Sequence, residues 1–439
     1  MQTEEGTGCP GSSPLGNWVR PLGKLVITEM PGEGRGCPVC AWMEEGRVAE
    51  VLLPPLEQAG VFGNIYVGQV ERVLPDIRGA FVRIDKNRTC FYDLSEQEQA
   101  IYVGRSDDHG GRQVNGPYHL KAGDRLLVQV SRERMRGKRP AVTSRLSVTG
   151  RYLVLEAPGA QLRLSRKLSG SDRIRMRGYM ESAMEPEPSG GYGILVRTNA
   201  RRADRQEIFR ELDLLKKRLR QICERGRSLP AGSLVEASRP FYLMAIQNAR
   251  AEDLAGIVTD VPGIYEEIQA YLRDLQPEDL PKLRLYEDAH LSLYHLYSLG
   301  HVLKGIRKPR VWLKSGGSLV IEQTEAFVSI DVNTGGYVAK KESRKTYRKI
   351  NLEAAQEIAF QLRLRNLSGA VLVDFINMEE EEDERELMRV FQGYLDRDPV
   401  KADVVDITAL KIVEVARQKV RRPVAEELEM FDMRERKKI

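Results

Sequence analysis

The alternation of apolar and polar positions predicts a strand-rich first third of the chain. From Lys24 the segments LVIT and RVAEVLL flank a stretch rich in Gly, Pro and Cys, a pattern typical of a hairpin with an elaborated tip. Between about Asn64 and Ser147, the short alternating segments IYVGQVERV, GAFVRI, CFYDL and RLLVQV are separated by turn residues. Short, evenly spaced strands without a long helical period predict a small β-barrel.

Helical periodicity enters after the barrel. Apolar residues at spacings of three and four predict an amphipathic helix over Asp204–Arg225. A second helix is predicted over Asn351–Arg365, with Asn351 as its N-cap. The apolar segments FVSID and GAVLVD lie before and after it, and the second has the continuous apolar character of a strand buried in an α/β sheet. The pattern therefore predicts a multidomain chain of the α+β class.

Composition narrows the class of protein but does not identify it. The 439 residues are enough for about three domains. A formal net charge of +5 is too small to indicate a nucleic-acid-binding protein without knowledge of where the charges lie. No apolar run approaches the ~20 residues that span a bilayer, and the acidic N-terminus lacks an apolar signal core. Five cysteines, sparse and odd in number, argue against a disulfide framework. We therefore expect a cytoplasmic protein without a membrane partner.

Carboxylates end two of the apolar strands and form the sharpest candidate site. Asp331 and Asn333 close one strand, while Asp374 and Asn377 follow the other. Sites in open α/β sheets gather at the carboxyl ends of strands. Oxygen ligands without a neighbouring His or Cys suit Mg²⁺ better than zinc, and bound Mg²⁺ activates water toward a phosphoryl group. The alternative is that these residues cap the turns that follow the strands.

Aromatic and basic residues alternate in the predicted barrel. Phe81 and Phe91 lie on successive strands, with Arg83 nearby, and the Arg-rich run 131–140 follows another strand. Barrels of this kind bind single strands by stacking bases on aromatic rings above a basic groove. The alternative is that both rings belong to the barrel core.

Two weaker signals complete the candidate chemistry. Arg197 and Thr198 end the strand GILV, where a guanidinium fork beside a hydroxyl could hold a terminal phosphate. Cys37 and Cys40 have the spacing of zinc ligands, but they supply only two of the four ligands that a structural site needs.

Longer motifs resemble those of a known family. SIDVNTGGYVAKKE and INLEAAQEIAFQLRLRNLSGAVLVDFINME closely resemble the catalytic signature of the ribonuclease E/G family. GNIYVGQVERVLPDIRGAFVRI resembles its S1 RNA-binding domain, and AVTSRLSVTGRYLVL with GILVRT resembles its 5′-sensor region. The resemblance extends in order from about Gly63 to Arg422.

The resemblance implies a division of the chain into domains. It places an S1 (OB-type) barrel at 61–147 and a 5′-sensor subdomain at 148–238. An RNase H-like subdomain would be split between 1–60 and 239–307. A DNase I-like α/β catalytic domain would occupy 308–439.

The resemblance also implies an activity, namely Mg²⁺-dependent or Mn²⁺-dependent cleavage within single-stranded, often A/U-rich RNA, with a preference for 5′-monophosphate ends. Such an endoribonuclease would act in RNA processing and decay. The residues that match the family's functional positions are Asp331 and Asp374 (metal), Asn333 (scissile phosphate), Arg197 and Thr198 (5′-phosphate), Phe81, Phe91 and Lys138 (S1 contacts with RNA) and Lys401 (a basic residue of the catalytic domain).

Two departures from the family pattern qualify this interpretation. The second signature usually reads DFIDM, whereas this chain has Asn377 in place of the last aspartate. The family's zinc-link, a CPxCxGxG segment after the catalytic domain, is missing. Cys37 and Cys40 from two chains could together hold one zinc in a homodimer, but we favour unliganded cysteines in a monomer because a CxxC pair alone is weak evidence.

Two other functions remain open at this point. The first is an RNA-binding S1 protein that has weak nuclease activity or has lost it. The second is a DNA nuclease with the same metal chemistry, which the sensor and S1 resemblances disfavour.

Overall fold

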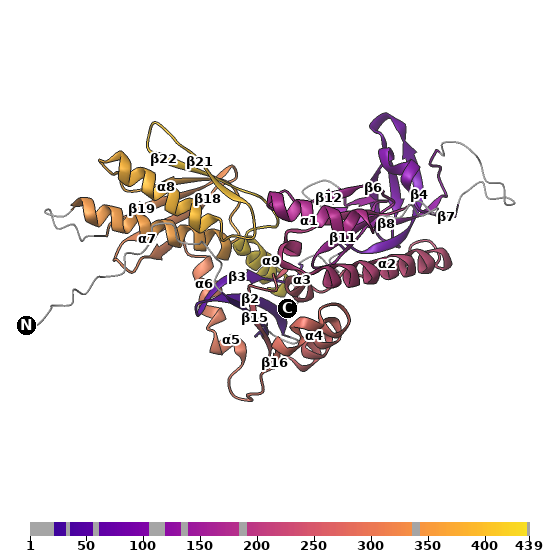
Figure 1. Cartoon of the computed structure of the whole chain (residues 1–439), viewed down its shortest axis with the longest axis horizontal. Coiled ribbons are helices and arrows are strands. Elements are labelled where there is room, and N and C mark those ends of the chain that lie inside the picture. The colour runs from indigo at the N-terminus through magenta and orange to yellow at the C-terminus, as the bar shows by residue number, and fades with distance from the viewer. Residues whose placement is uncertain are drawn as a thin grey trace, which may run out of the picture. The chain divides into compact units, whose positions relative to one another are not determined.

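The computed structural model describes residues 22–31, 36–55, 61–104, 119–132, 139–183, 191–335 and 343–436. It confirms a mixed α+β chain, which forms two compact units (Figure 1). The first unit contains Met1–Leu53, Asp253–Val261 and Arg284–Ile439, and the second contains Pro54–Glu252 and Pro262–Leu283. No helix in the described ranges is long and apolar enough to cross a bilayer.

A closed five-stranded barrel dominates the start of the second unit, as the sequence predicts. Its strands pair in the order β4-β5-β6-β9-β8, and pairing of β4 with β8 closes the ring. The strands are β4 (Ile65–Leu74), β5 (Gly79–Arg83), β6 (Thr89–Asp93), β8 (Arg125–Arg132) and β9 (Ala141–Thr143). Small and branched apolar residues such as Ala80, Val82 and Val128 fill the interior. This architecture is consistent with an OB-type barrel.

A four-stranded sheet, packed against a long helix, forms the rest of the second unit's core. Its order is β10-β11-β13-β12. The elements are β10 (Leu146–Thr149), β11 (Leu153–Ala157), β12 (Leu162–Leu164), β13 (Gly193–Val196), α1 (Gly170–Glu181), α2 (Arg205–Ser228), α3 (Phe241–Asn248) and α4 (Pro262–Leu275). Asp204 and Glu207 form a capping box at the start of α2. The predicted apolar stripe of α2, including Ile208, Leu212 and Leu215, lies in the core with the sheet.

The N-terminal sheet of the first unit joins distant parts of the chain. Its order is β16-β15-β1-β2-β3, with β1 (Gly23–Met30), β2 (Cys37–Glu44), β3 (Arg47–Leu52), β15 (Leu254–Thr259) and β16 (Leu283–Leu285). The prediction of a hairpin with an elaborated tip was wrong here. The Cys37–Glu44 segment is itself the central strand of an antiparallel meander, paired with β1 on one side and β3 on the other. Its residues Cys40, Ala41 and Met43 are buried, which favours a strand over a turn.

The second sheet of the first unit has helices on one face. Its order is β17-β18-β19-β20-β22-β21, with β17 (Arg310–Trp312), β18 (Ser318–Gln323), β19 (Phe327–Asn333), β20 (Gly369–Asp374), β21 (Ala402–Ile407) and β22 (Ile412–Arg417). Helices α7 (Ser343–Leu364) and α8 (Glu381–Leu395) lie side by side against it (Figure 1). Three further helices of this unit are α5 (Leu293–Leu296), α6 (Leu299–Ile306) and α9 (Val424–Arg436).

Strand alternation separates a core face from an open face of this sheet. Val328, Ile330 and Val332 are buried under the helices, whereas Asp331 and Asn333, which alternate with them, are exposed. The sheet therefore presents its polar strand ends on the face opposite α7 and α8. The five-part domain division, including the RNase H-like and DNase I-like assignments, stays a prediction.

Candidate metal centre and RNA-contacting surfaces

The two predicted metal ligands lie next to each other on the open face. Strands β19 and β20 are parallel, and their register pairs Asp331 with Asp374. Neighbouring strands are ~4.8 Å apart, and residues in register point to the same side. Both aspartates are exposed. The structure therefore brings together the two carboxylates that the sequence analysis selected.

The surroundings of this pair favour a cation. The Asn333 side chain donates a hydrogen bond from Nδ2 to Asp331 Oδ2 at 2.6 Å. Among the described residues, no Lys or Arg forms an ion pair with Asp331 or Asp374. Two adjacent carboxylates repel each other unless a cation neutralises them, so this donor set fits a hard divalent ion. No group of three or more His, Cys, Asp or Glu side chains is placed to hold a metal in the described parts of the chain. Mg²⁺ commonly takes one or two carboxylates and completes its shell with water and phosphate.

Asn351 anchors the chain just after Asp374, a role that the sequence analysis missed. Helix α7 begins at Ser343, so the prediction of Asn351 as an N-cap was wrong. The fully buried Asn351 side chain instead donates to Ile376 O at 2.7 Å and accepts from Ile376 N at 3.1 Å. This pair of bonds ties the end of β20 to the helix layer. A buried amide in an otherwise apolar helix stripe is the sequence signal that could have revealed it.

Two other residues of the catalytic region differ in their position relative to the aspartates. Asn377 is exposed three residues beyond Asp374. Lys401 precedes β21 and forms an ion pair with Asp403 at 2.8 Å. Strand register places Ala402 opposite Arg417 and Asp374 opposite Ile412. Lys401 therefore lies at the end of the sheet away from Asp374, about five residues along the strand direction.

The predicted aromatic pair lies on the outside of the barrel. Phe81 and Phe91 are directly opposite each other on β5 and β6, and both are half-buried. They alternate with core residues such as Val82 and Tyr92, which excludes the interpretation that the two rings fill the barrel interior. The Arg139 guanidinium lies 4.7 Å from the centre of the Phe81 ring. Lys138 lies outside the described residues.

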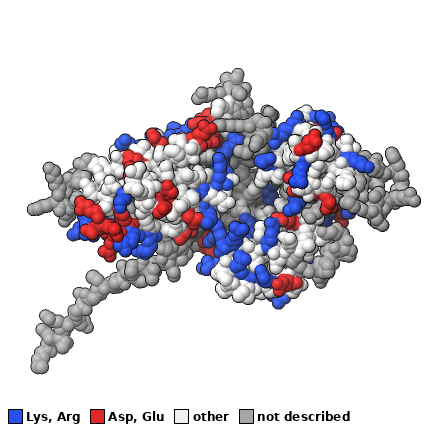
Figure 2. Space-filling view, turned by 90° about the horizontal axis from the view of Figure 1, so that it is seen from above, with Lys and Arg blue, Asp and Glu red and all other residues white. Residues whose placement is uncertain are grey.

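Charge alone does not single out an RNA-binding surface. On the face drawn in Figure 2, Lys and Arg are interspersed with Asp and Glu in small groups. The aromatic and cationic pairing at Phe81 is therefore more informative than the net charge.

The side chains of Arg197 and Thr198 already form hydrogen bonds with other residues of the protein. The Arg197 guanidinium donates from Nη1 to Gly150 O at 2.6 Å and from Nη2 to Asn248 Oδ1 at 2.7 Å. Thr198 Oγ1 lies 2.8 Å from the Ser165 hydroxyl. Burial lowers the pKa of Arg197 from its ordinary value. Because a guanidinium has five N–H groups, donors remain for a phosphate.

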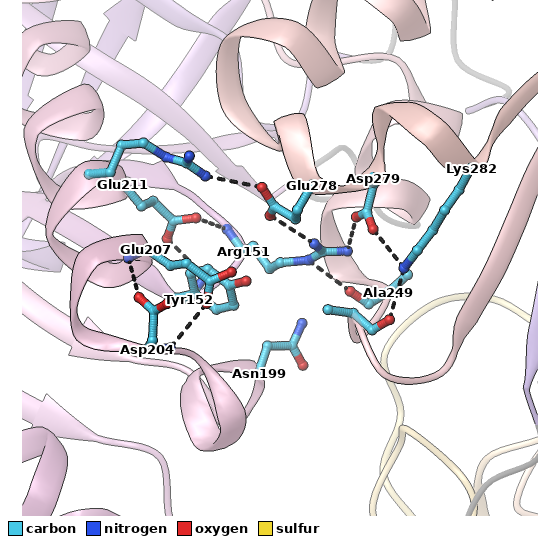
Figure 3. A network of polar contacts seen from close by, with 12 residues as sticks. Arg151, Tyr152, Asn199, Asp204, Glu207, Glu211, Ala249, Glu278, Asp279 and Lys282 are labelled. Atoms are coloured by element: carbon cyan, nitrogen blue, oxygen red, sulfur yellow. Dashed lines mark hydrogen bonds and ion pairs between the residues drawn. The ribbon is translucent and has the colours of Figure 1, made fainter.

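A buried polar network holds the turn to which Arg197 binds (Figure 3). The Glu211 carboxylate accepts backbone hydrogen bonds from Arg151, Tyr152 and Leu153 at 2.7–2.8 Å. Burial raises the pKa of Glu211, against the effect of these three donors. The Arg151 side chain, fully buried, pairs with Asp279 at 2.5 Å. The 150–153 turn is therefore fixed from both sides, and sequence spacing gave no sign of this network.

The cysteine pair does not form a metal site. Cys37 and Cys40 lie within β2, and three residues along a strand place side chains on opposite faces of the sheet. Cys40 is fully buried, and its burial raises the pKa of the thiol. The placement of both cysteines in a hairpin tip was therefore wrong, and the geometry gives no support to a zinc ion shared through them.

Comparison with known proteins identifies the family. The sequence model of the ribonuclease E/G family matches residues 147–420, more than half of the chain. The chain belongs to the ribonuclease E/G family.

Individual relatives cover most of the chain. It is 28% identical to ribonuclease G of Haemophilus influenzae over 399 residues, which cover 91% of this chain and 80% of that protein. Ribonuclease G of Escherichia coli K12 is likewise 28% identical, over 91% of this chain and 81% of its own length. Ribonuclease E of Synechocystis sp. is 32% identical over 363 residues, 81% of this chain but only 52% of that protein. The chain thus spans about half the length of this ribonuclease E.

Proposed function

We propose that this chain is an endoribonuclease of the ribonuclease E/G family that cleaves single-stranded RNA with a divalent metal ion, Mg²⁺ or Mn²⁺. The observation that carries the proposal is the register of Asp331 with Asp374 on the open sheet face. Two exposed carboxylates at this spacing, with no ion pair to a described Lys or Arg, would hold the ion. RNA processing and decay in the cytoplasm is the role that such an activity would serve.

The residues at the site would have different roles in hydrolysis. A metal ion bound there would supply an activated water and stabilise charge on the phosphate. Asp331 and Asp374 would hold the ion, and Asn333 donates one amide hydrogen to Asp331. The second amide hydrogen of Asn333 can then orient a non-bridging oxygen of the scissile phosphate. Attack of water on the phosphorus would form a new P–O bond and break the P–O3′ bond. The 3′ oxygen would leave with a proton, which gives 5′-phosphate and 3′-hydroxyl ends.

The second unit would bind the substrate. Phe81 and Phe91 offer two adjacent rings on the barrel exterior for base stacking, with Arg139 beside them. Lys138 of this unit would add a contact with the RNA backbone, and Lys401 of the first unit would add another. Arg197 and Thr198 would bind a 5′-monophosphate, since the guanidinium keeps unused donors next to a hydroxyl. These two residues would produce a preference for monophosphorylated ends.

Incubation with a 5′-monophosphorylated single-stranded oligoribonucleotide, with and without Mg²⁺, tests the proposal. We expect internal cleavage that requires the metal and yields products with 5′-phosphate ends. Metal-independent cleavage, or cleavage of DNA but not RNA, would contradict it.

A second candidate function is an RNA-binding protein with weak nuclease activity or none. The observation in its favour is Asn377, which stands where the family usually has a further aspartate. Tight RNA binding without cleavage at any Mg²⁺ concentration would favour this function over the first.

A further inference from the structure

An exposed tryptophan lies on the same sheet face as the metal ligands. Trp312 ends the edge strand β17 and is 67% exposed, although tryptophan side chains are usually buried to a large extent. The register pairs Trp312 with Ser318, and Ser318 with Asn333. Directly paired residues of antiparallel strands share a face. The indole and Asn333 are therefore on the open face, two strands apart, with about 10 Å between their Cα atoms.

Three cationic residues lie close to Trp312 in the sequence, and one of them contacts its ring. Lys308, Arg310 and Lys314 are exposed, and together with Trp312 they form what we call the β17 patch. The Arg310 guanidinium lies 5.6 Å from the centre of the Trp312 ring, a distance at which a cation is attracted to an aromatic face. Arg307 next to the patch is paired with Asp432 at 2.7 Å. The described residues provide no ion pair for the three cations of the patch.

The protein holds the patch in place. Val311, between Arg310 and Trp312, packs against the core under α7. The turn that follows is fixed by Glu353 of α7, whose carboxylate accepts a hydrogen bond from Lys314 N at 2.6 Å. The ring is therefore presented on a supported edge strand, and an aromatic ring among free cations is the combination that binds single-stranded nucleic acid.

We infer that the indole of Trp312 stacks on a base of the RNA strand beside the phosphate held at Asp331 and Asp374, while the cations of the β17 patch contact the adjoining backbone. The inference rests on the proposed function. Arg310 packs against the ring, and the exposed remainder of the indole is available to the base. By strand spacing, the Cα atoms of Asp331 and Asp374 lie roughly 12 and 16 Å from that of Trp312. A strand of about two nucleotides can span this separation, so the stacked base would lie within about two nucleotides of the scissile bond.

Trp312 can be tested with abasic substrates. We would use a 5′-hydroxyl oligoribonucleotide with one cleavage site, and a series in which single nucleotides flanking that site lack their base. Trp312→Ala should lower kcat/KM on the intact strand about 5- to 150-fold, the range expected for loss of one stacked base. With the abasic nucleotide at the stacking position, wild type and Trp312→Ala should become equal. A loss that stays the same across the whole abasic series would overturn the inference.

Further variants separate stacking from other roles of the ring. Trp312→Phe should keep most of the activity, whereas Trp312→Leu, apolar but unable to stack, should resemble Trp312→Ala. Val420→Ala is the control, because Val420 is 55% exposed and follows the end of β22 away from Asp374. Equal activity of the Phe and Leu variants would contradict stacking. A change of mass in light scattering for Trp312→Ala, without dependence on the base, would show that the ring contacts a second protein instead.

Fluorescence distinguishes failure of this inference from failure of the proposed function. The chain has three tryptophans, so quenching that is lost in Trp312→Phe can be assigned to Trp312. RNA should quench this signal without Mg²⁺, when no cleavage occurs. Quenching without any metal-dependent cleavage would overturn the proposed nuclease while supporting the RNA contact. Cleavage without quenching would overturn the contact alone.

Discussion

The Asp331–Asp374 pair and the Arg197 region differ in how far the protein itself pairs their charged groups. The two aspartates are exposed, carry like charge in register, and have one described side-chain partner, Asn333. Arg197 is half-buried and already donates to Gly150 O and Asn248 Oδ1. The carboxylate oxygens of the first region can still bind an added cation, whereas the guanidinium of the second already donates hydrogen bonds to the protein.

This difference indicates where stability and function reside. Like charges side by side cost folding energy, and the protein accepts that cost where a cation is to bind. The network of Glu211 and Arg151 does the reverse, because each buried charge or carboxylate has several partners. Substitutions of the two aspartates should therefore change catalysis with little effect on folding, and substitutions in the Glu211–Arg151 network should do the opposite.

The largest expected effect is on catalysis. Asp331→Asn or Asp374→Asn should each reduce single-turnover cleavage by orders of magnitude, since one of two ligands is lost. The melting temperature should stay constant or rise slightly, because one of two repelling charges is removed. Glu322→Gln, an exposed acid of neighbouring β18, is the control and should keep full activity. Normal turnover by both aspartate variants would mean that the metal lies elsewhere.

The buried network should show the converse pattern. Arg151→Met removes one partner of the buried pair with Asp279 and should lower the free energy of unfolding by about 3–5 kcal/mol. Arg210→Met, which removes a more exposed partner of Glu278, should cost less than ~1 kcal/mol. Urea denaturation measures both. Equal, small losses would show that the network is not a source of stability, and the contrast between the two regions would be lost.

The pattern of apolar residues along the sequence predicted many of the helices and strands. It did not predict contacts between residues that are far apart in the sequence. Alternation located the barrel, and the stripe of Ile208 and Leu212 located α2, because each signal is carried by neighbouring residues. The role of Asn351 could not be predicted from neighbouring residues, because its partner Ile376 lies 25 residues away, in the segment after β20. The strand-end rule predicted the meeting of Asp331 and Asp374. No comparable sequence rule predicts the Glu211–Arg151 network, because the residues that form it come from separate segments of the chain.

The barrel exterior offers an intermediate case, because its two phenylalanine rings are apolar and only half-buried. Phe81→Ala and Phe91→Ala should each weaken RNA binding by ~1–3 kcal/mol if the rings stack on bases. Their outward position predicts a smaller loss of stability than the ~3–5 kcal/mol of a core phenylalanine. Thermal melts beside titrations with a single-stranded oligoribonucleotide measure both quantities. A large fall in melting temperature with unchanged affinity would contradict stacking.

Substitution of Arg197 tests whether a guanidinium that already donates hydrogen bonds to the protein also binds the RNA 5′-phosphate. Arg197→Ala should lower kcat/KM on 5′-monophosphorylated RNA about tenfold or more, the cost of a charge-assisted hydrogen bond. Cleavage of 5′-hydroxyl RNA should change little, because that substrate gives the guanidinium nothing to bind. Asn248→Ala removes an anchor of the fork but keeps the charge, so it should reduce the preference only in part. Equal losses on both substrates would show that Arg197 is structural.

The smallest expected effect comes from restoring the residue that the family usually has. Asn377 is exposed three residues beyond Asp374, so a carboxylate there would add negative charge near the proposed metal site. Asn377→Asp should therefore lower the Mg²⁺ concentration needed for half-maximal cleavage a few-fold, as expected for ~0.5–1 kcal/mol between partly screened charges. Asn377→Ser is the matched control, because it also removes the amide but adds no charge. If Mg²⁺ dependence is the same in all three proteins, the two in-register aspartates define the metal affinity without help from this position.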